Sequence, residues 1–200
     1  VFRKSNDSIR LATALLNTGE MYRLQSKLDT AEIYFKESQA LFGPLNYQIG
    51  VAYNLGNIGL IYASKGQNKL AEKNISDASD ILNQLGDRYP IAVYSTYMAD
   101  IYNEKGDINL ALEYATKSLT IGEEEGLKEQ IRDASLKLSE LYQSIGKFKD
   151  AYEYQSQYIA YRDSVNNAET IRKMAERETQ YQVGQKQAEL ELVEARQKAE

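Results

Sequence analysis

The sequence contains no cysteine and no histidine among its 200 residues. Their absence excludes disulfide bonds, thiol nucleophiles, Ser-His-Asp triads and the zinc sites that these two residues usually build. It also removes the side chain that most often serves as a general acid or base. We therefore expect this chain to hold no catalytic constellation, no metal and no cofactor, so that any enzymatic activity of the parent protein lies outside it.

Other features are scarce as well. Only two prolines occur, which leaves room for long uninterrupted helices. No run of about 18 apolar residues is present, so we expect no membrane span within this chain. The net charge of −5 is spread evenly and no basic stripe appears, so we expect no nucleic-acid partner.

No signal peptide is visible, and the sequence runs from Val1 to Glu200, where it stops inside a helical pattern. We interpret it as a piece of a longer protein whose targeting signals lie elsewhere. The expected compartment is the cytoplasm, with the periplasmic part of a membrane-bound sensor as the alternative.

What the sequence does contain is a repeat with a period of 40 residues. Three columns carry it over four copies: Tyr22, Tyr62, Tyr102 and Tyr142; Ala31, Ala71, Ala111 and Ala151; and Ser26, Gly66, Gly106 and Gly146. Small residues let two helices approach closely, and Gly or Ser four residues after the Tyr can end a helix in a left-handed conformation. The Tyr fills space between packed helices, and Tyr34, Tyr114, Tyr152 and Tyr154 are expected to pack on the second helices.

The repeat resembles the tetratricopeptide family, whose signature spaces small residues, an aromatic and an Ala in the same way. The first copy reads Leu15-x2-Thr18-Gly19-x2-Tyr22, then Ala31-x3-Phe35. The period of 40 rather than 34 residues is a departure. The resemblance implies an all-α, right-handed superhelical solenoid of four hairpins over residues 1–160, divided near 8–45, 46–86, 87–126 and 127–160.

The pattern predicts first helices near 7–25, 46–65, 88–105 and 127–145, and second helices near 28–42, 68–85, 108–124 and from 148 onward. Asn6 or Asp7 is predicted to cap the first helix. Pro44 and Pro90 fall near the starts of the second and third hairpins, where proline is tolerated.

Residues 161–200 form a different region, rich in Ala, Glu, Gln, Lys and Arg. A heptad line suited to helix pairing runs through Ile171, Met174, Glu178, Tyr181, Gln185, Ala188 and Leu192. Glu178 and Gln185 weaken that seam, so we predict a marginal coiled coil that couples regions and can form a homodimer.

The segment from Tyr158 to Asn167, followed by this charged helix, resembles the end of the tetratricopeptide region in bacterial signalling proteins. In that group the repeats precede a sensor histidine kinase or a nucleotide cyclase. The resemblance implies a regulatory module that couples partner binding or self-association to an output domain. A free-standing adaptor or peptide-binding scaffold is the alternative.

Tetratricopeptide stacks bind ligands in a concave groove lined by the first helices. Aligning the copies places in this groove Leu16, Glu20, Arg23, Tyr53, Asn57, Leu60, Tyr97, Asp100, Glu104, Lys137 and Glu140. This mixture suits a protein or peptide with basic and apolar side chains, and ordinary solvated helix positions are the alternative interpretation. A clamp for a terminal carboxylate is disfavoured, because Arg23, Asn57 and Lys137 are isolated and the acids would repel the ligand.

Overall fold

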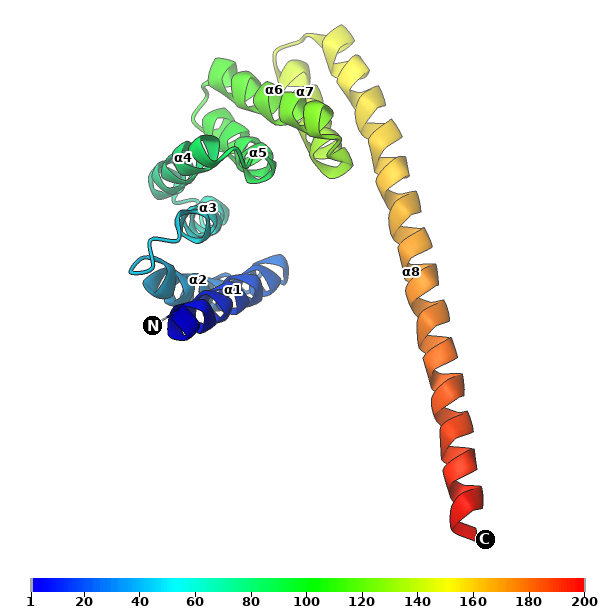
Figure 1. Ribbon diagram of the computed structural model, residues 1–200. Helices are drawn as coiled ribbons and strands as arrows, with labels where there is room; N and C mark the ends of the chain where they lie inside the picture. Colours follow the sequence, from blue (N-terminus) through cyan, green and yellow to red (C-terminus); the bar gives the residue numbers. More distant parts are fainter. Residues whose placement is uncertain (1, 200) are drawn as a thin grey trace.

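The computed structural model describes the backbone of residues 2–199 and the side chains of residues 7–177, 179–180, 182–184 and 186–187. Within this part of the chain every regular element is a helix, and the helices pack as antiparallel pairs (Figure 1). The fold is the predicted all-α solenoid of four hairpins.

The helices agree closely with the sequence pattern. They are α1 (Phe2–Leu24), α2 (Leu28–Phe42), α3 (Gln48–Ser64), α4 (Asn68–Leu85), α5 (Tyr89–Glu104), α6 (Ile108–Glu125), α7 (Lys128–Ser144) and α8 (Phe148–Ala199). One local prediction is wrong. Because α1 already begins at Phe2, Asn6 and Asp7 lie inside the helix and do not cap it.

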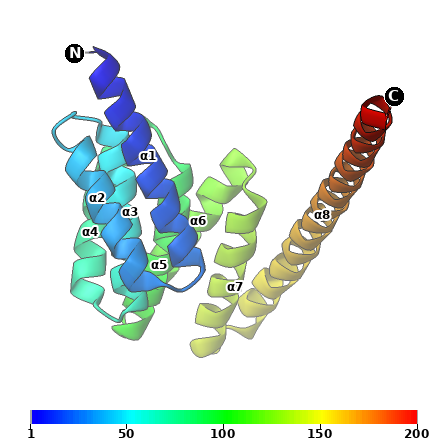
Figure 2. The same cartoon turned by 90° about the horizontal axis from the view of Figure 1, so that it is seen from below.

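The stacking order places the first helices on one side. Each hairpin joins the next through its second helix, by contacts of α2 with α3, α4 with α5 and α6 with α7. The first helices also contact one another directly, α1 with α3, α3 with α5 and α5 with α7. They therefore form a continuous inner layer, as Figures 1 and 2 show.

The turns inside the hairpins follow the predicted column. Ser26, Gly66, Gly106 and Gly146 all adopt a left-handed backbone, with φ of 59°, 69°, 79° and 73°. The next residue then donates its N–H to the carbonyl of the signature Tyr, as Gln67 does to Tyr62 at 2.8 Å. This bond closes the end of the first helix and directs the chain into the second.

Small residues bring the two helices of a hairpin into close contact. A Cβ added to Gly19 would lie 2.8 Å from the Phe35 ring, and one added to Gly59 would lie 2.7 Å from Ile75. The Ala column lies opposite, with Ala31, Ala71 and Ala111 fully buried. The predicted close approach of the two helices is confirmed both for the small residue three before the Tyr and for the Ala of the second helix.

Three of the four signature tyrosines stack on a second tyrosine twelve residues later, and the exception is Tyr62, where that position is Asn74. The ring pairs Tyr22–Tyr34, Tyr102–Tyr114 and Tyr142–Tyr154 have centroids 5.4, 5.4 and 5.5 Å apart. The expectation for Tyr152 is wrong, since this side chain is 74% exposed. Its helix face points away from α7, toward the position that a further hairpin would occupy.

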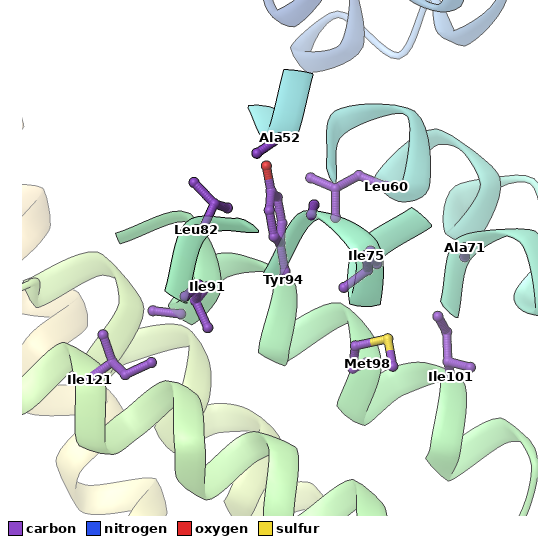
Figure 3. Packing of buried hydrophobic residues seen from close by; sticks show 12 residues of the cluster. Ala52, Leu60, Ala71, Ile75, Leu82, Ile91, Tyr94, Met98, Ile101 and Ile121 are labelled. Carbon is purple, nitrogen blue, oxygen red and sulfur yellow. The ribbon is translucent and has the colours of Figure 1, made fainter. Parts of the chain in front are cut away.

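The largest group of buried residues joins hairpins 2 and 3 (Figure 3). Tyr94 from α5 lies in this group with Leu60 and Ile91, and its ring points toward Ala52 of α3. A Cβ on Gly56 would lie only 2.0 Å from Tyr94, so the ring occupies the space that Gly56 leaves open.

The last helix is continuous over 52 residues. Its first part packs on α7, and its remainder extends beyond the stack (Figure 1). The backbone has no break near residue 160, where the sequence composition changes. None of the helices in the described residues combines the length and the apolar character needed to cross a membrane.

Candidate functional site

The inner layer lines an open cavity of about 530 Å³ on the concave side of the stack. All four first helices contribute to it. Its lining consists of Leu16, Asn17, Glu20, Arg23 and Leu24 from α1, Tyr53, Asn57 and Leu60 from α3, Tyr89, Pro90, Val93, Tyr94 and Tyr97 from α5, and Glu129, Gln130 and Asp133 from α7. A ligand in this cavity would touch every hairpin at once.

One wall is a cross-connection between α1 and α5. Arg23 makes two hydrogen bonds to Glu20, at 2.8 and 2.7 Å, and donates a third to the Tyr97 hydroxyl at 3.3 Å. The hydrogen bonds to Glu20 raise the pKa of Arg23 against the opposing effect of burial. Because Arg23 and Tyr97 are 74 residues apart, this contact joins hairpins 1 and 3 across the groove.

The floor of the cavity is aromatic and amide-bearing. Leu60 and Asn57 are buried. The Tyr53 hydroxyl donates to Asp87 at 2.9 Å. Burial and this hydrogen bond raise the pKa of Tyr53, and burial likewise raises the pKa of Tyr94. The O–H of Tyr53 is thus already engaged by Asp87, and Tyr94 contributes a nearly buried ring to the lining.

A second hollow of about 240 Å³ lies beside Tyr97 and includes Asp100 and Glu104. Lys137 of α7 forms ion pairs with Asp100 at 2.7 Å and Glu140 at 2.8 Å. Burial alone would lower the pKa of Lys137, but the hydrogen bonds to these two carboxylates raise it. Lys137 thus joins α5 to α7 rather than standing ready for an anionic ligand.

The charge of the central cavity is negative. Its lining holds one arginine, which is paired, and three carboxylates, Glu20, Glu129 and Asp133. Asp133 pairs with Arg132 at 2.6 Å, and Glu129 is exposed at the rim. Tyrosine rings next to carboxylates attract basic side chains through both cation–π contacts and ion pairs.

The structure brings most predicted groove residues together. Leu16, Glu20, Arg23, Tyr53, Asn57, Leu60 and Tyr97 line the central cavity, while Asp100 and Glu104 line the second hollow and Lys137 and Glu140 pair beside it. The lining residues that the sequence prediction missed include Asn17, Tyr89, Pro90, Val93, Tyr94, Glu129, Gln130 and Asp133. The repeat itself contained a signal, because Val93 and Asp133 follow Tyr53 by one and two periods of 40 residues.

The predicted pairing residues of the tail lie on α8. Ile171 and Met174 are 68% and 65% exposed. The side chains of Glu178, Tyr181, Gln185, Ala188 and Leu192 lie outside the described residues. The described residues also contain no group of three or more carboxylates arranged to hold a metal ion.

Comparison with known proteins gives the fold and little more. No protein-family model matches the chain, and no curated protein matches its sequence. Among solved structures, BtubC (BKLC) from P. vanneervenii aligns with a TM-score of 0.66 at 16% identity, over 78% of this chain and 65% of that one. Aspartyl phosphate phosphatase F from Bacillus subtilis aligns with a TM-score of 0.72 at 15% identity, over 79% of this chain and 42% of that one.

Both structures are helical repeat solenoids, so the tetratricopeptide-like fold is confirmed. At this level of identity the similarity concerns the fold alone. This chain spans less than two thirds of the length of either protein.

Proposed function

We propose that this chain is the protein-interaction and regulatory module of a bacterial signalling protein, and that it binds a protein segment in the concave groove. The observation that carries the proposal is the cavity of about 530 Å³ to which all four first helices contribute. A site shared by every hairpin couples binding to the curvature of the whole stack.

The preferred ligand is an extended segment with basic and apolar side chains. Glu129 and Asp133 can accept hydrogen bonds from Lys or Arg, and Tyr89 and Tyr97 offer rings against which aliphatic or cationic groups can pack. An acidic segment is disfavoured, because Glu20 and Asp133 are already paired with Arg23 and Arg132 and the exposed Glu129 would repel it.

Transmission to an output domain uses α7, which touches both the ligand site and α8. Gln130 and Asp133 line the cavity on one side of α7. On its other side Ser139 donates to the Ala151 carbonyl of α8 at 2.9 Å, and Ser135 bonds Gln157 at 3.0 Å. A ligand that shifts α7 therefore shifts α8 with it.

In this proposal residues 1–160 receive the partner, and residues 161–200 pass its effect on through weak homodimeric pairing of α8 that includes Ile171 and Met174. A kinase or cyclase activity would belong to the parent protein outside this chain, in the cytoplasm. One neighbour is named as an aspartyl phosphate phosphatase from a bacterium, a name that is compatible with this signalling context.

The groove is tested by selecting peptides from a displayed random library on the intact chain. We expect the recovered sequences to be enriched in Lys and Arg beside apolar residues. A Glu129→Lys, Asp133→Lys double variant should lose this enrichment. The matched control, Asp77→Lys with Glu113→Lys, changes the same charge on exposed positions of α4 and α6 and should keep it. Equal behaviour of the two double variants would remove the groove from the proposal.

The coupling step is tested with a Met174→Cys variant, since the chain has no other cysteine. Parallel pairing of α8 should give an efficient 174–174 disulfide, strengthened by Glu178→Leu with Gln185→Leu. No cross-link at tens of micromolar would favour the adaptor instead. The adaptor has support of its own, because the cavity is built entirely from residues 16–133 and needs no tail.

A further inference from the structure

The face of hairpin 1 that points away from hairpin 2 carries an apolar stripe, and within the described part of the chain α1 contacts only α2 and α3. Leu11, Ala14, Thr18 and Met21 follow one another on α1 at intervals of three or four residues, which places them on one face. Leu11 is 54% exposed and Met21 is 62% exposed. This face of hairpin 1 is therefore apolar where a capping face of a solenoid would be polar.

The same positions are buried in the later hairpins, except that Val51, the equivalent of Leu11 in hairpin 2, is half-buried. Met21 corresponds to Ile61, Ile101 and Leu141, which are 0%, 2% and 1% exposed, and Leu11 corresponds to Ile91 and Ile131, which are 1% and 3% exposed. The second helix of the preceding hairpin covers them. A Cβ on Gly122 of α6, for example, would lie 3.0 Å from Ile131. The stripe is thus one side of an interface that the chain makes three times internally.

The opposite side of that interface is exposed at the other end of the stack. On hairpin 4, Phe148 and Tyr152 are 69% and 74% exposed, and Ile159 is 40% exposed. One repeat earlier, Ile108 and Leu112 pack against the buried cluster of hairpins 3 and 4, and Leu119 belongs to it. Helix α6 ends at Glu125, which corresponds to Val165 in α8. Because α8 continues straight past this position, it does not fold back over this face (Figure 1).

The internal interfaces also define how the two ends would meet. Between hairpins 2 and 3, Asn68 donates to Glu104 at 2.8 Å. Moving Asn68 forward by two repeats gives Phe148, and moving Glu104 back by two repeats gives Leu24, which is 69% exposed. A polar pair inside the stack therefore becomes an apolar pair at its ends.

A second internal contact leads to the same result. Tyr102 donates to Glu72 between hairpins 2 and 3. The equivalent residues at the two ends are Tyr22 and Tyr152, which places two aromatic rings in contact. The charges also agree with this arrangement. Asp29 and Lys65 form an ion pair between hairpins 1 and 2, and their equivalents at the two end faces are Lys149 and Gln25, so this position brings no like charges together.

We propose that the two end faces bind each other between copies of this chain, so that hairpin 4 of one copy stacks on hairpin 1 of the next. The partner is a second copy of the chain, and the contact continues the 40-residue repeat from one molecule into another. It is a head-to-tail contact, which extends into longer assemblies as concentration rises unless the rotation closes a ring. It does not use the pairing positions of α8, and of the residues named here only Leu24 also lines the edge of the concave cavity.

The test uses two single-cysteine variants, Leu24→Cys and Phe148→Cys, mixed at about 100 µM with a short bismaleimide reagent. Head-to-tail stacking predicts that the mixed 24–148 product exceeds both the 24–24 and the 148–148 products. The control replaces Leu24→Cys by Ile33→Cys, whose position is also exposed but corresponds to the outward-facing Lys73 and Glu113. A mixed product no stronger than this control, or a predominance of the symmetric products, would overturn the proposal.

A second measurement separates this contact from pairing of α8. Met21→Glu should raise the dissociation constant of self-association, measured by sedimentation, by about tenfold or more, because it puts a charge into an apolar interface. Ile33→Glu should leave it unchanged. Met174→Glu should leave the 24–148 cross-link intact, and loss of that cross-link in this variant would overturn the proposal.

Discussion

Helix α8 is uninterrupted, but its first part, which packs on α7, and its second part, which extends beyond the stack, are held by different interactions. In the first part Tyr154 stacks on Tyr142 of α7 at 5.5 Å, and Ala151 is 7% exposed. In the second part Ile171 and Met174 are exposed, and the ion pairs between residues 169 and 176 are local. Lys173, for instance, pairs with Glu169 one turn away at 2.6 Å.

The tertiary packing of the first part, against the local ion pairs of the second, indicates which part of the protein unfolds as a unit. Local ion pairs contribute only about 0.3–0.5 kcal/mol each, and a helix without tertiary contacts is marginal in water. The stack from α1 to the first part of α8 should therefore unfold cooperatively, while the exposed part of α8 frays independently.

The largest expected effect comes from a cavity mutation in the stack. Leu138 is completely buried on α7, so Leu138→Ala should lower the free energy of unfolding by about 2–5 kcal/mol in urea titrations. The matched change in the tail, Ile171→Ala, removes a similar side chain at an exposed position and should change it by less than about 0.5 kcal/mol. Equal losses would mean that the tail folds together with the stack.

The next effect uses two glycines in opposite surroundings. Gly56→Ala would push a methyl group into the Tyr94 ring, 2.0 Å from the nearest ring atom, and should cost about 1–3 kcal/mol of stability. Gly184→Ala meets no atom within 4 Å and should instead raise the helicity of the tail, since Ala favours a helix by about 1 kcal/mol over Gly. Thermal unfolding and far-ultraviolet circular dichroism measure both. A stabilised Gly56→Ala variant would show that the ring can move aside.

The sequence predicted the stack well because its period is strict. Tyr, Ala and Gly columns report local constraints, such as the left-handed turn at Gly106 and the close packing at Gly59, and each constraint acts within one hairpin or between neighbours. Such short-range requirements repeat wherever the residues repeat. The prediction for Tyr152 failed for a related reason. A residue at this position is covered only where another hairpin follows, and no further hairpin follows α8 among the described residues, so Tyr152 is exposed.

The candidate site was harder to predict for a different reason. The Arg23–Tyr97 hydrogen bond joins hairpins 1 and 3, and its formation depends on the curvature that accumulates from small rotations between hairpins. No single repeat encodes that sum. The contribution of Glu129 from α7 to the same cavity also follows from this curvature.

A smaller effect is expected from the tyrosine pairs. Tyr142→Leu removes the stacked contact with Tyr154 and should lower the free energy of unfolding by about 0.5–1.5 kcal/mol. Tyr152→Leu changes the same residue type at an exposed position of the neighbouring helix and should leave the stability of the monomer unchanged within about 0.5 kcal/mol. Urea titration at low protein concentration keeps self-association out of the comparison. A loss at Tyr152 as large as that at Tyr142 would contradict the exposure of its ring.

The smallest effect concerns two carboxylates whose pKa values are both lowered. The hydrogen bond from Lys105, at 2.5 Å, and that from Tyr102 hold the pKa of Glu72 below its ordinary value of 4.5, and the hydrogen bond from Lys173 does the same for Glu169. A lowered pKa in the folded state means that the stabilisation is fully present above the unfolded pKa and is lost as the pH falls through the folded pKa.

Glu72 links hairpins 2 and 3, so Glu72→Gln should lower the free energy of unfolding at pH 7 by less than about 1 kcal/mol. The same change should make the loss of stability below pH 4.5 less steep. Glu169→Gln should leave the unfolding of the stack unchanged at every pH, because Glu169 and Lys173 both lie on the exposed part of α8. If the free energy of unfolding below pH 4.5 changed equally in both variants, the tail would belong to the same cooperative unit as the hairpins.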